Sequence, residues 1–167
     1  MIPLKDENPA ERFPLVTIAL VAVNLAAFWW QVAGFGLQAS VLRGGAIPYE
    51  ILTFQDIEYR DLVPPPLTIF TSMFLHASFG HVGFNMLTLW IFGNNVEDAL
   101  GRFRFVAFYL LSGIAAALAQ TLASAMSGDP MAIQTPMVGA SGAIAGVLAA
   151  YLSLFPRHRI LTLILPI

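Results

Sequence analysis

One serine stands at the start of a long apolar run, with a glycine on each side that leaves its surroundings open. Ser141 is the third residue of Gly139-Ala140-Ser141-Gly142, and the apolar run continues to Phe155. A serine hydroxyl acts as a nucleophile when a base removes its proton, and neighbouring glycines let other backbone approach it closely. The structural alternative is a hydroxyl that bonds the carbonyl one turn back, as serines in membrane helices do. Ala143 replaces the second glycine of the hydrolase Gly-x-Ser-x-Gly motif, so the chemistry needs partners from elsewhere in the chain.

A second polar group precedes another apolar run, in the stretch His76-Ala77-Ser78-Phe79-Gly80-His81-Val82-Gly83-Phe84-Asn85. His81 and Asn85 are four residues apart, so on a helix they project from one face. Polar side chains at membrane depth are expensive, and they face the interior of a helix bundle or a water-filled cavity. One interpretation is that the pair caps a helix or bridges two helices. The other is that both side chains, with the backbone N–H of Ser141, donate hydrogen bonds to an acyl oxyanion.

The composition predicts that most of this polypeptide lies in a membrane. Of its 167 residues, 57% are hydrophobic and 11% charged, and the mean hydropathy is +0.74. Soluble domains contain about 45–50% apolar and about 25% charged residues. The absence of cysteine excludes disulfides, thiolate catalysis and thiolate metal sites. No basic patch indicates a nucleic-acid partner.

Four apolar segments are long enough, or nearly so, to span a bilayer, which takes about 20 residues. They run over residues 13–34, 80–99, 105–125 and 141–155. Residues 35–75 are too polar to span and too apolar for a free linker, so we expect an amphipathic, partly helical element in the membrane interface. Gly142 and Gly146 form a Gly-x-x-x-Gly face that lets another helix pack closely. Residues 160–167 begin a further apolar run.

Basic residues predict the orientation of these spans. If four helices cross in turn, one side of the membrane receives six basic residues: Lys5, Arg12, Arg102, Arg104, Arg157 and Arg159. The other side receives Arg43 and Arg60. The positive-inside rule then places the N-terminus in the cytoplasm, with Ser141 and the long interfacial segment toward the outer side.

These motifs, in this order and spacing, resemble the rhomboid family of intramembrane serine proteases. The resemblance rests on His-x-x-x-x-His-x-x-x-Asn at the opening of one span and Gly-x-Ser-Gly at the opening of another, two spans later. Three further features agree: the long loop after the first span, Glu97 with Gly101-Arg102-Phe103, and Tyr109-Leu110-x-Ser112-Gly113. The resemblance covers residues 13–159, and the later part is similar to prokaryotic members.

The resemblance implies a site and an activity. Ser141 matches the nucleophile, and His81 and Asn85 match the residues that hold the oxyanion together with the Ser141 amide. His76, Gly139 and Gly142 are supporting residues, and Glu97 matches a position that makes structural hydrogen bonds. The implied activity is hydrolysis in or beside the transmembrane segment of a membrane protein, without metal or cofactor. The implied partners are transmembrane substrates and the lipid bilayer, and the implied location is multi-pass in a bacterial inner membrane.

The sequence departs from the family pattern at the general base. In the family this base is a histidine on the sixth helix, in an Ala-His-x-x-Gly setting that this sequence lacks. His158 lies about 17 residues beyond Ser141, or about 25 Å along a helix, and cannot take its proton. We therefore expect a C-terminally incomplete rhomboid-like helical bundle, with four complete transmembrane helices and the start of a fifth. Residues 1–12 are expected to be a cytoplasmic tail and 13–167 the membrane domain, inactive as this piece alone.

Two alternatives remain. A non-catalytic rhomboid-like protein would bind membrane helices without cleaving them, and the absence of the downstream histidine would favour it. A small pore or transporter subunit would line a water path with the same polar residues, but it leaves the grouping of His81, Asn85 and Ser141 without a purpose.

Overall fold

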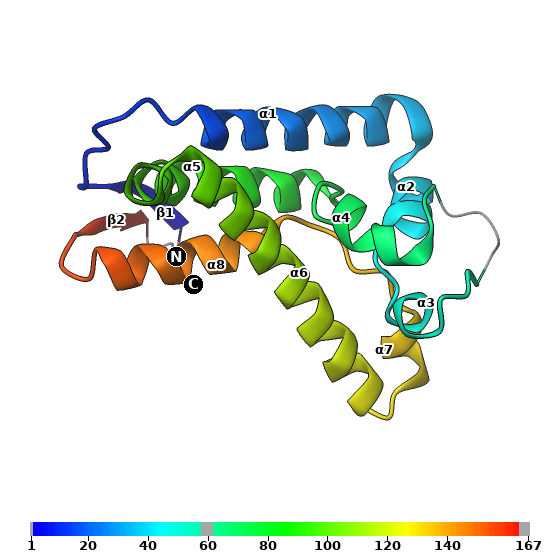
Figure 1. The fold of residues 1–167 in the computed structure, drawn as a ribbon. Helices are drawn as coiled ribbons and strands as arrows, with labels where there is room; N and C mark the ends of the chain where they lie inside the picture. The colour runs from blue at the N-terminus through cyan, green and yellow to red at the C-terminus, as the bar shows by residue number, and fades with distance from the viewer. Residues whose placement is uncertain (1, 58–61, 164–167) are drawn as a thin grey trace.

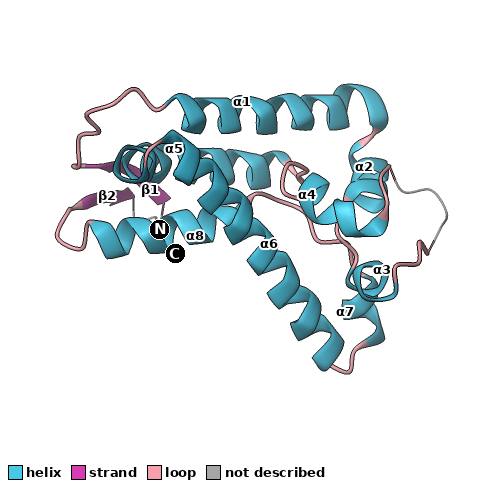
Figure 2. Cartoon of the chain, viewed as in Figure 1, coloured by secondary structure: helices cyan, strands magenta, loops and turns pink. Residues whose placement is uncertain are grey.

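The computed structural model describes residues 2–57 and 62–163, and it is built mainly of helices (Figures 1 and 2). Four long helices coincide with the four predicted spans: α1 (Leu15–Trp30), α5 (Phe79–Leu100), α6 (Arg102–Met126) and α8 (Ser141–Leu154). A π-helical turn, η1 (Gln31–Phe35), continues α1. Gly101, with a φ of +77°, separates α5 from α6. Positive φ suits glycine, which has no Cβ, so the chain can turn sharply here.

The segment between α1 and α5 is partly helical, as expected for an interfacial element. It contains α2 (Leu37–Gly44), α3 (Pro48–Thr53), the 3₁₀ turn η2 (Pro65–Leu67) and α4 (Thr68–Ser72). Together with α7 (Pro130–Gln134), α2, α3 and α4 lie at one end of the molecule (Figure 1). Large apolar side chains in this segment are exposed, including Leu42, Leu52, Phe54 and Leu67. This exposure fits contact with lipid rather than water.

The predicted close-packing faces meet between α6 and α8. A methyl group added at Gly142 would lie 2.6 Å from Ala116 Cβ, and one added at Gly146 would lie 2.6 Å from Ser112 Cβ. Only hydrogen at these two positions lets the backbones approach so closely, which confirms the Gly-x-x-x-Gly prediction. The buried residues Leu89, Phe105, Tyr109 and Tyr151 fill the core beside this contact.

The end of the bundle opposite α2 and α3 is held by buried carboxylates. Glu97 on α5 accepts hydrogen bonds from Val16 N (3.0 Å), Thr17 N (2.8 Å) and Thr17 Oγ1 (2.8 Å) at the start of α1. The first N–H groups of a helix lack partners within it, so Glu97 satisfies two of them. Its structural role is thereby confirmed. Asp6 accepts hydrogen bonds from Asn95 Nδ2 on α5 and Tyr151 OH on α8.

One prediction is wrong: residues 160–163 do not begin a fifth helix. They form strand β2 (Ile160–Leu163), which pairs antiparallel with β1 (Ile2–Asp6). The physical reason is that β1 offers a row of backbone donors and acceptors, and Ile160 and Thr162 are β-branched residues that favour strands. The tail expected at residues 1–12 therefore includes a paired strand, and the domain boundary at residue 12 stays a prediction.

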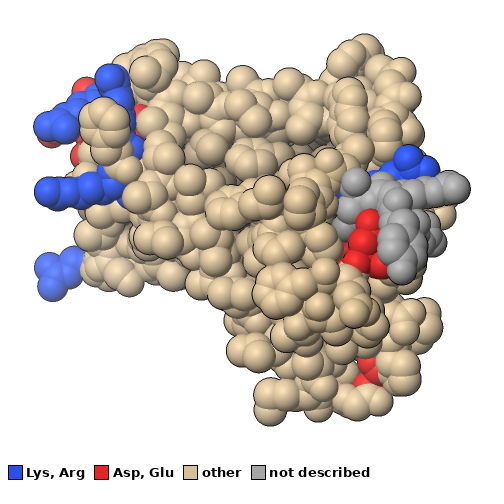
Figure 3. Space-filling view, turned by 45° about the vertical axis from the view of Figure 1, so that its right-hand side comes forward, with Lys and Arg blue, Asp and Glu red and all other residues tan. Residues whose placement is uncertain are grey.

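Among the residues that the structure describes, two helical segments are long and apolar enough to cross a membrane, Leu15–Phe35 and Arg102–Met126. The helix α8 is apolar but shorter, and α5 carries several polar residues, so the count of four spans stays a prediction. Lysine and arginine side chains gather on the side of the molecule that carries β1 and β2 (Figure 3). This segregation is what the positive-inside argument requires, and the orientation itself stays a prediction.

Candidate active site

Ser141 is the first residue of α8, and the segment before it is fixed by backbone hydrogen bonds. Met137 exchanges two such bonds with Ala46, each 2.9 Å, and Gly139 N donates to Ser72 O at 2.8 Å. The Ser141 side chain is exposed and makes no hydrogen bond within the described residues, whereas Ser153 in the same helix donates to Ala149 O. The structural alternative for Ser141, a bond to the carbonyl one turn back, is therefore not observed.

His81 and Asn85 lie against the residue two positions before Ser141. A methyl group added at Gly139 would lie 2.6 Å from His81 Nε2 and 3.6 Å from Asn85 Nδ2. Ser78 Oγ accepts from His81 N and caps α5, so both side chains stand in the first two turns of that helix. The start of α5 and the start of α8 thus bring the predicted oxyanion residues and the predicted nucleophile to the same region.

His76 supports Asn85 directly. His76 is fully buried, Asn85 is 4% exposed, and their Nε2 and Nδ2 atoms are 3.0 Å apart. An amide nitrogen only donates, so His76 Nε2 accepts and the ring is neutral with its proton on Nδ1. Burial lowers the pKa of His76 to about 4, which keeps the ring neutral at pH 7. The His76 and His81 rings meet edge to face, with centroids 5.1 Å apart.

None of the chain's three histidines is placed as a base for Ser141 in the way the family pattern requires. His158 lies beyond the other end of α8, where its ring meets Phe155 with centroids 5.6 Å apart. The helix between them has 14 residues, so it separates His158 from Ser141 by about 20 Å. Among the described residues, no group of three His, Asp or Glu side chains could hold a metal ion.

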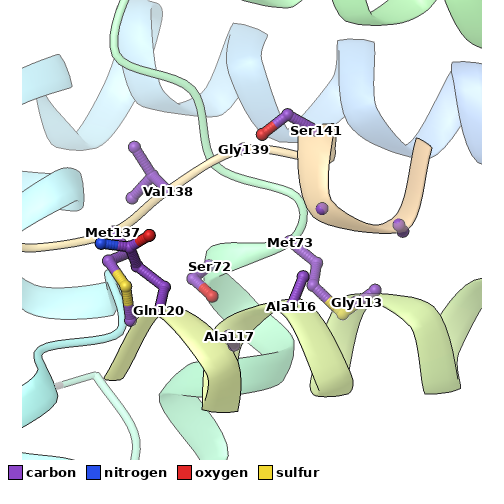
Figure 4. A pocket seen from close by; sticks show the side chains of 12 residues that line it. Ser72, Met73, Gly113, Ala116, Ala117, Gln120, Met137, Val138, Gly139 and Ser141 are labelled. Atoms are coloured by element: carbon purple, nitrogen blue, oxygen red, sulfur yellow. The ribbon is translucent and has the colours of Figure 1, made fainter. Parts of the chain in front are cut away.

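A cavity of about 210 Å³ adjoins Ser141 (Figure 4). Its wall is formed by the end of α4, by α6 and by the segment leading into α8. It is lined by Ser72, Met73, Gly113, Ala116, Ala117, Gln120, Met137, Val138, Gly139, Ser141, Gly142 and Ala143. The small residues of α6 leave this space open, and Met73 packs over Gly113, where a methyl group would lie 2.7 Å from its sulfur.

Sequence reasoning missed Gln31, a buried residue in the turn η1. Its side-chain amide bonds both backbone groups of His76. One signal was available, because a glutamine at the end of an apolar span is expensive unless it has partners.

Comparison with known proteins shows which family the chain resembles in sequence. The family model for the Rhomboid domain matches residues 65–167, more than half of the chain. The chain is 38% identical over 150 residues to Rhomboid protein 1, mitochondrial, of Saccharomyces cerevisiae, covering 89% of this chain and 39% of that protein. It is 32% identical over 142 residues to Rhomboid protease AarA of Providencia stuartii, covering 81% and 49% respectively. No solved structure matches the chain significantly.

These relatives bear on length and location. The chain spans less than half the length of either relative. The human Presenilin-associated rhomboid-like protein, mitochondrial, is 35% identical over 95 residues, covering 57% of this chain and 24% of that protein. The Rhomboid match and the apolar helices support a membrane location. Two of these three relatives are mitochondrial by name, so the bacterial inner membrane in particular is not supported. The match of the Rhomboid domain over more than half of the sequence shows that the chain belongs to the rhomboid family.

Proposed function

We propose that this chain carries the nucleophile and the oxyanion-binding residues of an intramembrane serine endopeptidase. The observation that supports this most directly is the contact of His81 and Asn85 with Gly139, two residues before Ser141. Ser141 opens α8, where backbone N–H groups lack partners within the helix and the helix dipole is positive. In this proposal two side-chain donors, from His81 and Asn85, and one backbone donor, from Ser141, bind the tetrahedral oxyanion.

The proposed reaction begins with attack of Ser141 Oγ on the scissile carbonyl, as a base removes the hydroxyl proton. His81, Asn85 and the Ser141 amide hold the resulting oxyanion. The leaving amine takes the proton from the base, an acyl-enzyme forms, and water releases it. A histidine outside this chain supplies the base, because His76 and His81 have other roles and His158 lies at the far end of α8. The greater length of the relatives is consistent with such a residue.

The proposed substrates are transmembrane or juxtamembrane segments of membrane proteins. A substrate helix must unwind before its backbone can reach Ser141, so small or helix-breaking residues near the cleavage site favour the reaction. The proposed chemistry uses no metal or cofactor, since a serine, a base and the oxyanion donors suffice.

The test uses the full-length protein reconstituted in liposomes with a transmembrane reporter substrate. We expect Ser141→Ala to abolish cleavage and Ser153→Ala, a hydroxyl on the same helix that bonds its own backbone, to retain it. We also expect a fluorophosphonate to label the full-length protein at Ser141 and to leave the isolated 167-residue chain unlabelled. Cleavage that survives Ser141→Ala would exclude Ser141 as the nucleophile, and labelling of the isolated chain would show that no outside base is needed.

A second candidate is a non-catalytic protein that binds membrane helices. The position of His158 favours it, because no histidine of this chain is placed to activate Ser141 in the family's manner. This candidate predicts that the full-length protein binds the reporter helix with unchanged affinity after Ser141→Ala and never cleaves it. Cleavage by the wild-type protein decides against it.

A further inference from the structure

We propose that Gln31 is a positioning residue that acts through His76 to hold the Asn85 amide in its oxyanion-binding orientation. The proposal rests on the proposed function, because it assigns a role in the same site. Gln31 lies in η1, 45 positions before His76 in the sequence, and it does not touch the reacting atoms.

Gln31 is fully buried at the first position of η1, the π-helical turn that ends α1. Single π-turns are rare in proteins and occur frequently at functional sites. The Gln31 side-chain nitrogen donates two hydrogen bonds, and its side-chain oxygen accepts one. Its Nε2 donates to Ser40 Oγ at 2.8 Å and to His76 O at 3.1 Å, and its Oε1 accepts from His76 N at 2.9 Å.

His76 depends on this amide because it lies outside regular structure. It belongs to the segment between α4 and α5, where its backbone N–H and carbonyl have no helical partners. Within the described residues, Gln31 is the partner of both groups. The Gln31 side chain therefore hydrogen-bonds both backbone groups of His76, as a neighbouring strand would, and fixes the orientation of this residue.

The His76 ring transmits this position to Asn85. Its Nε2 accepts one hydrogen of the Asn85 amide at 3.0 Å, and the second amide hydrogen remains free to donate. The ring is also confined by Phe28 and His81, with centroids at 6.4 Å and 5.1 Å. Because Asn85 Nδ2 already faces Gly139, a shift of the His76 backbone would move this donor relative to Ser141.

The decisive experiment is a double-mutant cycle in the full-length protein, in liposomes with the transmembrane reporter. Gln31→Met conserves volume and removes all three hydrogen bonds. We expect it to lower kcat by about 10–100-fold, the scale of a displaced catalytic group, with KM changed less than about twofold. In an Asn85→Ala background the same substitution should lower kcat by less than about twofold, since the group that Gln31 positions is gone.

Asn24→Met is the matched control. Asn24 is buried on α1, two turns before Gln31. Its amide donates to Leu20 O and also interacts with the Tyr109 hydroxyl, but among the described residues it makes no hydrogen bond to His76 or Asn85. Any loss of kcat that it causes should be the same with and without Asn85. The proposal would be overturned if Gln31→Met lowered kcat by the same factor with and without Asn85. It would also be overturned if Gln31→Met left kcat unchanged. A wild-type protein that cleaves nothing would instead refute the proposed function.

A second measurement does not depend on activity. In the full-length protein, Gln31→Met should speed hydrogen exchange at the His76 amide, which loses its acceptor, while Asn24→Met should not. If the His76 amide exchanges at the same rate in the wild type and in Gln31→Met, Gln31 does not hold the His76 backbone. This result would contradict the proposal even where the variant is too unstable for kinetics.

Discussion

Gly139 and His81 are in direct contact: the imidazole Nε2 stands where a side chain at position 139 would begin, 2.6 Å from an added methyl group. Gly139 also has a φ of +120°, a conformation that residues with a Cβ rarely adopt. The two facts have one consequence. The His81 ring packs against the Gly139 backbone, two residues before Ser141. Glycine is required at position 139 because a Cβ would collide with the ring and because its φ is positive.

Gly139→Ala should therefore reduce proteolysis by about 100-fold, because His81 must move by about 1 Å or more to admit the methyl group. Gly128→Ala is the control. Gly128 has a φ of +72° but no atom within 4 Å of an added methyl group, so this variant carries backbone strain without the clash. Cleavage rates in liposomes should fall for the first variant only. Equal losses would show that strain, and not the His81 contact, explains the requirement.

Asn85→Ala should slow cleavage by about 10²–10³-fold, the loss measured when one oxyanion donor is removed from a serine protease. Thr88→Ala offers a comparison on the same helix, since Thr88 is equally buried and its hydroxyl donates only to Phe84 O. Steady-state kinetics should place the Asn85 effect in kcat. An unchanged rate would remove Asn85 from the proposed mechanism.

Gly146→Ala should destabilise the α6–α8 contact, and Ser112→Gly should restore it. The added methyl group would collide with Ser112 Cβ and Oγ, and overpacking of this kind costs about 1–3 kcal/mol. Ser112→Gly removes both atoms, leaving Phe108 at 3.8 Å, an ordinary contact. The unfolding free energies of the wild type, the two single variants and the double variant give the coupling free energy between positions 146 and 112. A double variant that is no more stable than Gly146→Ala would show that the clash lies elsewhere.

Asp6 should make the β1 region less stable at neutral pH than in acid. Burial raises the pKa of Asp6 above 3.8, against smaller opposing effects of the Tyr151 hydroxyl, His158 and Lys5. The folded state thus favours the protonated acid. Its stabilising contribution is complete below pH 3.8 and is lost as the pH rises through the pKa of the folded state.

The comparison with Asp6→Asn isolates this effect, because an asparagine oxygen still accepts from Asn95 and Tyr151 and does not titrate. Hydrogen exchange of the β1 amides should be the same for both proteins near pH 3 and slower in Asp6→Asn near pH 7, after correction for intrinsic rates. The opposite order at pH 7 would mean that the ionised carboxylate stabilises the strand.

The sequence was sufficient to predict the four long helices and the placement of His81 and Asn85 on one face of the second of them. Apolar runs of fixed length and the four-residue spacing on a helix are local properties, so they can be recognised without a fold. The close contact at Gly142 and Gly146 was predictable for the same reason.

What the sequence did not predict depends on pairing between distant segments. Ile160–Leu163 is apolar in either interpretation, and only the presence of β1 beside it selects a strand. Gln31 has no motif, and its role depends on where the chain places His76, 45 residues later. Asp6 likewise gains its partners from α5 and α8, which are 89 and 145 residues away.

The pairing of β1 with β2 also determines how the molecule responds to tension. The two strands are antiparallel, and Ile2 pairs with Leu163 while Asp6 pairs with Ile160. The first residue of β1 therefore lies beside the last residue of β2. A force that separates Ile2 from Leu163 loads the outermost pair first, and the strands peel apart one pair at a time. Only after that opening does the load reach Asp6 and, through its bond to Tyr151, the helix that begins with Ser141.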